Sequence, residues 1–226
     1  MNTIRLALAA LSLVTATSAA SAATDLQAYK QLSGQWWQWA LSVPVAQNPL
    51  ADETGDSCMV GQRGSDWFLA GTFGVSTAAR TCSIPDGVTL FVPVANFVGF
   101  DTPNACGQDA TPLSSEFYRS IAADFIGGVI NASVTLDNKA VTPLHRVQSK
   151  VFAVALPRDN LFAAACAAYG GLPAGVYSPA IDDGIYVRLD RLAIGAHTLR
   201  VHAENPSWGF MLDVTYSLTV VPVVDK

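Results

Sequence analysis

The feature that most constrains the fold is a strict alternation of apolar and polar residues near the end of the chain. Residues 211–221 alternate in this way, with Leu212, Val214 and Tyr216 on the apolar side. A period of two places the apolar side chains on one face, as in a β-strand with one buried and one solvated face. Similar strand-like runs occupy residues 66–71, 80–84, 88–94, 130–136, 140–144, 147–156, 185–189 and 197–203.

These runs are short and are separated by turn signals such as Pro85-Asp86-Gly87 and Asp137-Asn138-Lys139. Many short strands joined in this way favour two packed layers of sheet. The sequence therefore predicts a mainly β fold, an antiparallel β-sandwich of jelly-roll or immunoglobulin-like type. The strands between 184 and 221 are expected to form a meander.

Two segments have helical rather than strand periodicity. Residues 24–41 carry an apolar stripe at three- and four-residue spacing, and Pro44 should end this helix. The stripe contains Leu26, Tyr29, Ser33, Trp36, Trp37 and Ala40. A second helix is expected over 112–126, with Thr111 as its N-cap, Pro112 in its first turn and Gly127-Gly128 at its end. The predicted fold thus has an N-terminal helix and one inserted helix.

The N-terminus has the three parts of a secretory signal peptide. A positive charge at Arg5 precedes an apolar segment over 6–14, and Ala20-Ser21-Ala22 is a small-residue cleavage site. Cleavage after Ala22 would leave 226 − 22 = 204 residues. This length suits a single domain over 23–226. The protein is therefore predicted to be exported to the periplasm or the extracellular medium.

Composition argues against several classes of partner. Half of the residues are hydrophobic and 14% are charged, which suits a packed core rather than a disordered chain. Loss of Arg5 leaves 12 Lys and Arg against 18 Asp and Glu, a formal charge of −6. A mildly acidic chain without a basic run is not expected to bind nucleic acid. Stable membrane insertion is not expected either, since the predicted mature chain has no long apolar run.

All four cysteines lie in the predicted mature chain. An even number in an exported protein indicates two disulfides, and four cysteines allow three pairings. The pairing Cys58–Cys82 with Cys106–Cys166 is favoured because neither loop has to thread the other. Loop entropy alone would make each bond worth roughly 3–4 kcal/mol.

The region from 36 to 96 contains the most unusual residues of the chain. Four of the five tryptophans lie between Trp36 and Trp67, and three of them form the run Trp36-Trp37-Gln38-Trp39. Tryptophan is costly to leave in water, so such a cluster is either a core anchor or an aromatic surface for a ligand. The candidate ligand-binding residues are Trp39, Asn48, Asp52, Gln62, Trp67, Arg80 and Asn96. A structural polar network is the competing interpretation for Gln62, Arg80 and Asn96, with Arg80 paired to Asp52 or Asp66. For Asn48 and Asp52 the competing interpretation is a solvated acidic loop in which both side chains form turn bonds to the backbone.

These residues belong to a motif set that resembles a group of exported bacterial proteins with no established activity. The motifs are W-W-Q-W at 36–39, N-P-x-x-D-x-T-G-x-x-C-x-x-G-Q at 48–62, W-F-L-A-G at 67–71 and R-x-C-x-x-P at 80–85. Further matching stretches extend through nearly all of the predicted mature chain. The resemblance implies export and one continuous fold, and it brings no catalytic residue with it.

Two hypotheses for function follow from the sequence. The first is a non-catalytic exported protein that binds a glycan or envelope polymer, or assembles with its own kind. It is based on the predicted sandwich, the tryptophan cluster and the lack of a nucleophile or cofactor motif. The second is a glycosidase-like hydrolase with a carboxylate pair between 48 and 101, drawn from Asp52, Glu53, Asp56, Asp66 and Asp101. No cofactor is expected, and Asp52 with Asp56 is a weak candidate for a Ca²⁺ site.

Overall fold

The computed structural model describes residues 13–223. Residues 1–12, which make up most of the predicted signal peptide, lie outside the described residues. The first helix, α1 (Leu13–Ser42), includes the last residues of that peptide. Cleavage after Ala22 would therefore leave α1 from residue 23 to Ser42.

The described chain is mainly β and contains two five-stranded sheets. Sheet A consists of β1 (Asp66–Phe68), β3 (Thr89–Phe100), β6 (His145–Gln148), β7 (Phe152–Leu156) and β8 (Gly175–Leu189). Sheet B consists of β2 (Thr77–Pro85), β4 (Ile130–Leu136), β5 (Lys139–Ala140), β9 (Gly195–Asn205) and β10 (Phe210–Val221). The remaining elements are α2 (Ser115–Gly127) and the short 3₁₀ turns η1 (Val45–Gln47), η2 (Ala167–Tyr169) and η3 (Pro206–Trp208).

The strand directions are mixed, not purely antiparallel as the sequence analysis predicted. Strand β1 runs parallel to β3, and β2 runs parallel to β10, while the other pairs are antiparallel. The turn at Pro85-Asp86-Gly87 explains part of this difference. It does not close a hairpin, because β2 before it belongs to sheet B and β3 after it belongs to sheet A. The edge of β2 is instead paired with the last strand of the chain.

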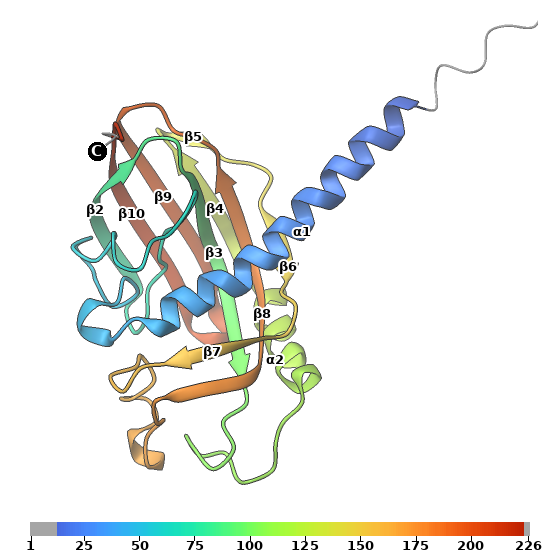
Figure 1. The fold of residues 1–226 in the computed structure, drawn as a ribbon, viewed down its shortest axis with the longest axis vertical. Helices are drawn as coiled ribbons and strands as arrows, with labels where there is room; N and C mark the ends of the chain where they lie inside the picture. Colours follow the sequence, from blue (N-terminus) through green and yellow to red (C-terminus); the bar gives the residue numbers. More distant parts are fainter. Residues whose placement is uncertain (1–12, 224–226) are drawn as a thin grey trace, which may run out of the picture.

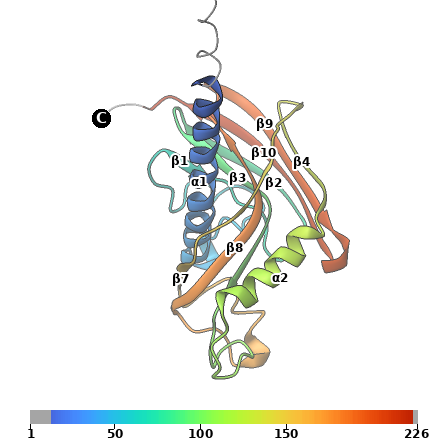
Figure 2. The same ribbon diagram turned by 90° about the vertical axis from the view of Figure 1, so that its right-hand side faces the viewer.

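Three layers follow one another across the molecule: α1, sheet A and sheet B (Figures 1 and 2). One cluster of buried side chains lies between the two sheets and includes Val92, Val187 and Val214. A second cluster lies between sheet A and α1 and includes Trp36, Phe91 and Tyr186. Sheet A is thus the central layer, with buried side chains on both faces.

This layering explains why the predicted meander is wrong. Strands β9 and β10 alternate between buried and exposed residues and are neighbours in sheet B. Strand β8 is buried without a break from Ala180 to Gly184 and belongs to sheet A. A strand covered on both faces loses the period-two pattern, so the sequence gives little indication of which sheet it joins.

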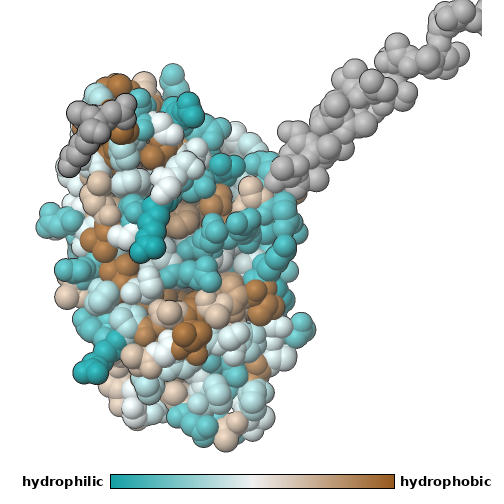
Figure 3. All heavy atoms as spheres, viewed as in Figure 1, coloured by the Kyte–Doolittle hydropathy of each residue, from teal (hydrophilic) through white to brown (hydrophobic). Residues whose placement is uncertain are grey.

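Both helices are found near their predicted positions with different boundaries, and α1 already begins at Leu13 instead of residue 24. Helix α1 ends at Ser42, two residues before Pro44, and its outward side is polar (Figure 3). Helix α2 begins at Ser115, and its N-cap is Ser114 rather than Thr111. The hydroxyl of Ser114 accepts a hydrogen bond from the backbone N–H of Phe117, whereas residue 113 is held outside the helix by Asp101.

Two disulfides join Cys58 to Cys82 and Cys106 to Cys166, which is the pairing favoured above. The first ties the loop after α1 to β2. The second joins the loop after β3 to the loop after β7. Disulfides of this kind are typical of proteins that fold in an oxidising compartment. Among the described helices, none combines the length and the apolar character needed to cross a membrane.

Candidate functional site

The strongest candidate site is a pocket that opens where β3 and β10 are no longer paired along one edge. Strand β1 pairs with β3 only as far as Phe91, and beyond that residue β3 pairs with β8 alone. In sheet B, β2 pairs with β10 only from Asp213 onward, so the start of β10 is also unpaired along that edge. The pocket has a volume of about 310 Å³ and is lined by both unpaired edges and by α1, which crosses β3 in Figure 1.

The walls of this pocket are almost entirely apolar. Six aromatic side chains line it: Trp36, Trp37, Phe73, Phe97, Phe162 and Phe210. Asn96 and Thr72 are its only polar side chains among the described residues. On β3, residues 90–95 are buried whereas 96–98 are partly exposed, which places the mouth beside Asn96. Within the described chain no acidic or basic side chain lines the pocket, so the cavity itself carries no acid–base group.

Behind Asn96 a chain of hydrogen bonds runs into the layer between α1 and sheet A. The Nδ2 group of Asn96 donates to the hydroxyl of Tyr186 over 3.2 Å. That hydroxyl donates to Oδ1 of Asp182 over 2.8 Å, and the indole N–H of Trp37 donates to the same oxygen over 2.7 Å. Asn96 is therefore connected to a buried carboxyl group through a tyrosine.

Asp182 is an unusual carboxyl group because it is fully buried and has no cationic partner within residues 13–223. Its residue exposure is 0%, and its Oδ2 atom has no hydrogen-bond partner among the described residues. Desolvation raises its pKa to about 7, against the opposing effect of hydrogen bonding by Tyr186, Trp37 and Ser33. Burial likewise raises the pKa of Tyr186, and the neighbouring Asp182 carboxyl raises it further.

A glycine makes the contact between Asn96 and Tyr186 possible. Gly184 lies opposite Asn96 in the β3–β8 ladder. A Cβ atom at position 184 would lie 2.5 Å from Cε2 of Tyr186 and 2.8 Å from Cβ of Asn96. Because real Cβ atoms do not approach so closely, any other residue would push these two side chains apart.

The neighbouring carboxylate, Asp183, has ordinary partners on the other face of sheet A. Arg146 donates to it from Nε and Nη2 at 3.0 and 2.9 Å, and Gln148 donates over 2.9 Å. This hydrogen bonding to Asp183 raises the pKa of the Arg146 guanidinium. Consecutive residues of a strand point to opposite faces, so Asp182 and Asp183 do not form a catalytic pair.

The tryptophan run proves to be an anchor of α1. The residue exposures of Trp36, Trp37 and Trp39 are 0%, 7% and 7%. Each indole N–H has a fixed acceptor, which is the carbonyl of Leu69 for Trp36 and the carbonyl of Val60 for Trp39. The core-anchor interpretation is thus the one that fits, and the alternative of an aromatic platform at Trp39 loses its basis because that ring is buried against Phe68.

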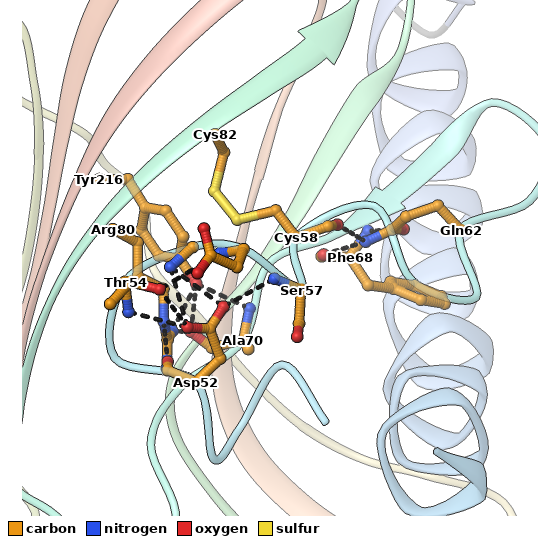
Figure 4. Close-up of a disulfide and its surroundings, with 12 residues drawn as sticks. Asp52, Thr54, Ser57, Cys58, Gln62, Phe68, Ala70, Arg80, Cys82 and Tyr216 are labelled. Carbon is orange, nitrogen blue, oxygen red and sulfur yellow. Dashed lines mark hydrogen bonds between the residues drawn. A yellow bond between two sulfur atoms is a disulfide. The ribbon is translucent and has the colours of Figure 1, made fainter. Parts of the chain in front are cut away.

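Three of the other predicted ligand residues hold the loop after α1 in place, and Figure 4 shows two of them, Asp52 and Gln62. Asn48 is 1% exposed and donates to the carbonyls of Ala40 and Val43 at the end of α1. Gln62 bonds both the N–H and the carbonyl of Phe68. The Asp52 carboxylate accepts from loop N–H groups at 54, 55 and 57. Desolvation opposes ionisation of Asp52, but these hydrogen bonds outweigh it and lower its pKa.

Arg80 is buried without an ion-pair partner among the described side chains. Its guanidinium donates to the backbone carbonyls of Asp52, Ala70 and Gly71 and to the hydroxyl of Tyr216, at 2.6–2.8 Å. The expected pairing with a carboxylate is wrong, because Arg80 meets the carbonyl of Asp52 and not its side chain. Its role is to satisfy loop carbonyls that face the protein interior.

Trp67 and the acidic residues of this region give no support to a binding or catalytic role. Trp67 is 6% exposed and lies in the core between the sheets. Asp66 lies 3.6 Å from Arg188, and Asp101 is buried and bonded by Gln108 and the N–H of Leu113. None of the five carboxylates of the hydrolase hypothesis, Asp52, Glu53, Asp56, Asp66 and Asp101, lines the pocket.

The Ca²⁺ hypothesis for Asp52 and Asp56 also has no structural support. The Asp52 oxygens already face N–H donors, an arrangement suited to a loop cap rather than to a cation ligand. Asp56 is exposed. Over residues 13–223, no group of three His, Cys, Asp or Glu side chains is placed to hold a metal ion.

Of the predicted candidates, the structure brings only Asn96 to the pocket. Sequence reasoning missed Asp182, Tyr186 and Trp37 as a connected group. The predicted strand began only at residue 185, so Asp182 was left outside it. The signal that could have revealed it is a pair of carboxylates within an otherwise apolar run that continues through Tyr186.

Comparison of the chain with family models and with curated proteins finds no match in either case.

Proposed function

We propose that this protein is an exported, single-domain β-sandwich that binds a small, largely apolar ligand and does not catalyse a reaction. The observation that carries this proposal is the pocket itself. It is lined by six aromatic rings, and its volume of about 310 Å³ lies at the lower end of the roughly 300–1,000 Å³ typical of small-molecule sites. Ligand sites of this kind are mostly apolar with a few placed polar groups, which here means Asn96 and Thr72.

The lack of an acid–base group in the pocket wall favours binding over catalysis. A general acid or base must come within hydrogen-bond reach of the reacting atom. Asp182 has a raised pKa of the kind found in active sites, but it is sealed behind Trp37 and Tyr186. A hydrolase of the carboxylate-pair type therefore has no supporting geometry.

A glycan is a less suitable ligand than the sequence analysis expected. Its case was based on an exposed tryptophan platform, and those rings are buried. An envelope polymer could still be the ligand if it carries an apolar group short enough to enter the pocket. The ligand is thus defined by the apolar part that it buries.

The proposal is tested by calorimetric titration of the mature protein with butylbenzene. We expect one binding site, and we expect it to be lost in Gly71→Leu. Gly71 lines the pocket, and a Cβ there would meet only Leu212 at an ordinary 3.7 Å, so a larger side chain can grow into the cavity. Gly127→Leu is the matched control, because Gly127 lies in α2 outside the pocket and has open space around it.

Two results would contradict the proposal. One is the absence of binding by any alkylbenzene or by its polar derivatives. The other is binding that Gly71→Leu leaves unchanged, since the ligand would then occupy a different place.

A further inference from the structure

We propose that the pocket selects ligands bearing a neutral hydroxyl group, held by Oδ1 of Asn96, over plain hydrocarbons, ethers and carboxylates. This inference depends on the proposed binding function and adds a ligand class to it. It follows from the direction of each hydrogen bond between the pocket and the buried Asp182.

The donors and acceptors between the pocket and Asp182 can be assigned by starting from the Asp182 carboxyl group. An indole N–H can only donate, so Trp37 must donate to Oδ1 of Asp182. An ionised carboxylate can only accept. Above the pKa of about 7 for Asp182, the single hydroxyl proton of Tyr186 is therefore directed at Oδ1 as well.

This arrangement fixes the orientation of the Asn96 amide. The hydroxyl oxygen of Tyr186 has used its proton on Asp182, so toward Asn96 it can only accept. The amide atom that lies 3.2 Å from it must then be the nitrogen. The amide oxygen is consequently the other corner of the side chain, and no described residue donates a hydrogen bond to it.

The pocket wall therefore offers an acceptor oxygen at its mouth and one further N–H of the same amide. A ligand hydroxyl matches both, because it can donate to Oδ1 and accept from Nδ2. An ether oxygen cannot donate and leaves Oδ1 without a partner once the ligand excludes water, which is unfavourable for a buried acceptor. A hydrocarbon leaves both groups without a partner.

Charge excludes the acidic analogue. No Lys, Arg or His lines the pocket within the described chain. A carboxylate ligand would lose its hydration without a cation in return, and the ionised Asp182 behind Tyr186 would repel it. The selection is thus for a neutral donor and against an anion.

The experiment compares four probes of similar shape by calorimetric titration of the mature protein at pH 8. They are butylbenzene, 4-butylphenol, 4-butylanisole and 4-butylbenzoate, and the phenol is neutral at this pH because its pKa is about 10. We expect the phenol to bind about threefold to tenfold more tightly than butylbenzene, the value of one neutral hydrogen bond. The anisole should bind more weakly than the phenol, and the benzoate should bind least.

Asn96→Leu provides the matched variant, because it keeps the size of the side chain and removes the amide. It should lose the preference for the phenol over butylbenzene, so that the variant binds these two probes with similar affinity. The ranking in the natural protein needs no variant, so the inference is tested even if Asn96→Leu does not fold.

The outcomes separate this inference from the proposed function. Butylbenzene binding without a preference for the phenol, or with equal affinity for phenol and anisole, would overturn the inference and leave the binding function standing. Tightest binding of the benzoate would also overturn it. Failure of all four probes to bind would overturn the proposed function and the inference with it.

Discussion

The buried carboxyl of Asp182 should make the stability of this protein depend on pH in an unusual direction. Its pKa is raised from 3.8 to about 7 in the folded protein, mainly by desolvation. Because the folded state binds this proton more tightly than the unfolded state, the contribution of Asp182 is most favourable below pH 3.8. It is lost progressively as the pH rises to about 7.

The magnitude follows from the size of the shift. A rise of about three pKa units at about 1.4 kcal/mol per unit corresponds to about 4 kcal/mol between the protonated and ionised limits. Asp182→Asn removes this ionisation and keeps an oxygen that can accept from Trp37 and Tyr186. The amide nitrogen would occupy the place of Oδ2, which already has no partner among the described residues.

The assay is urea unfolding of the mature protein with its disulfides intact, at pH 4, 5.5, 7 and 8.5. The free energy of unfolding of Asp182→Asn, minus that of the natural protein, should rise by about 4 kcal/mol across this range. At pH 8.5 the variant should be the more stable protein. Asp183→Asn is the control, since it breaks an ion pair with Arg146 and should lower stability at pH 8.5.

If the difference in free energy of unfolding between Asp182→Asn and the natural protein stays constant from pH 4 to 8.5, the predicted pH dependence is contradicted. This result would mean that the carboxyl group is not desolvated in the folded protein. A lower stability of the variant at pH 8.5 would lead to the same conclusion.

Three further predictions concern single structural features. Arg80→Lys should destabilise the protein by about 3 kcal/mol in urea unfolding, because one ammonium group cannot reach all the carbonyls that the guanidinium satisfies; a change below about 1 kcal/mol would argue against this role. Gly184→Ala should lower the free energy of unfolding by about 1–3 kcal/mol, because its Cβ would overlap the Tyr186 ring. An unchanged thermal unfolding curve would contradict the close contact. Replacing Cys58 and Cys82 together by Ala should cost about 3 kcal/mol, the loop entropy for a separation of 24 residues, which chemical denaturation can compare with the intact protein.

The parts of the fold that were predictable are those in which one face of an element meets water. Strands β9 and β10 and helix α1 bury one face, so period and element type could be inferred. Strand β8 is covered by α1 on one side and by sheet B on the other. Its apolar side chains follow no period, and both its length and its sheet were missed.

The candidate site was less predictable for a related reason. Gln62 and Arg80 were candidate ligand residues because they lie next to apolar runs, and Asp52 because it is one of several carboxylates in a short loop. The same pattern arises where a long loop must have its backbone groups satisfied by side chains, and this is what these residues do. Sequence alone does not distinguish a ligand residue from a residue that satisfies a loop, because the side chains are chemically identical and only their partners differ.

The tryptophan run acts on the pocket indirectly, by making its wall rigid. The indole N–H groups of Trp36, Trp37 and Trp39 each have one acceptor, located respectively on the loop after β1, on β8 and on the loop before β1. A buried ring that is packed and also hydrogen-bonded cannot turn without losing that bond. The rings of Trp36 and Trp37 that line the pocket are therefore held before any ligand arrives. Because ordering side chains on binding lowers affinity, a wall fixed in advance lets a small apolar ligand bind without that cost.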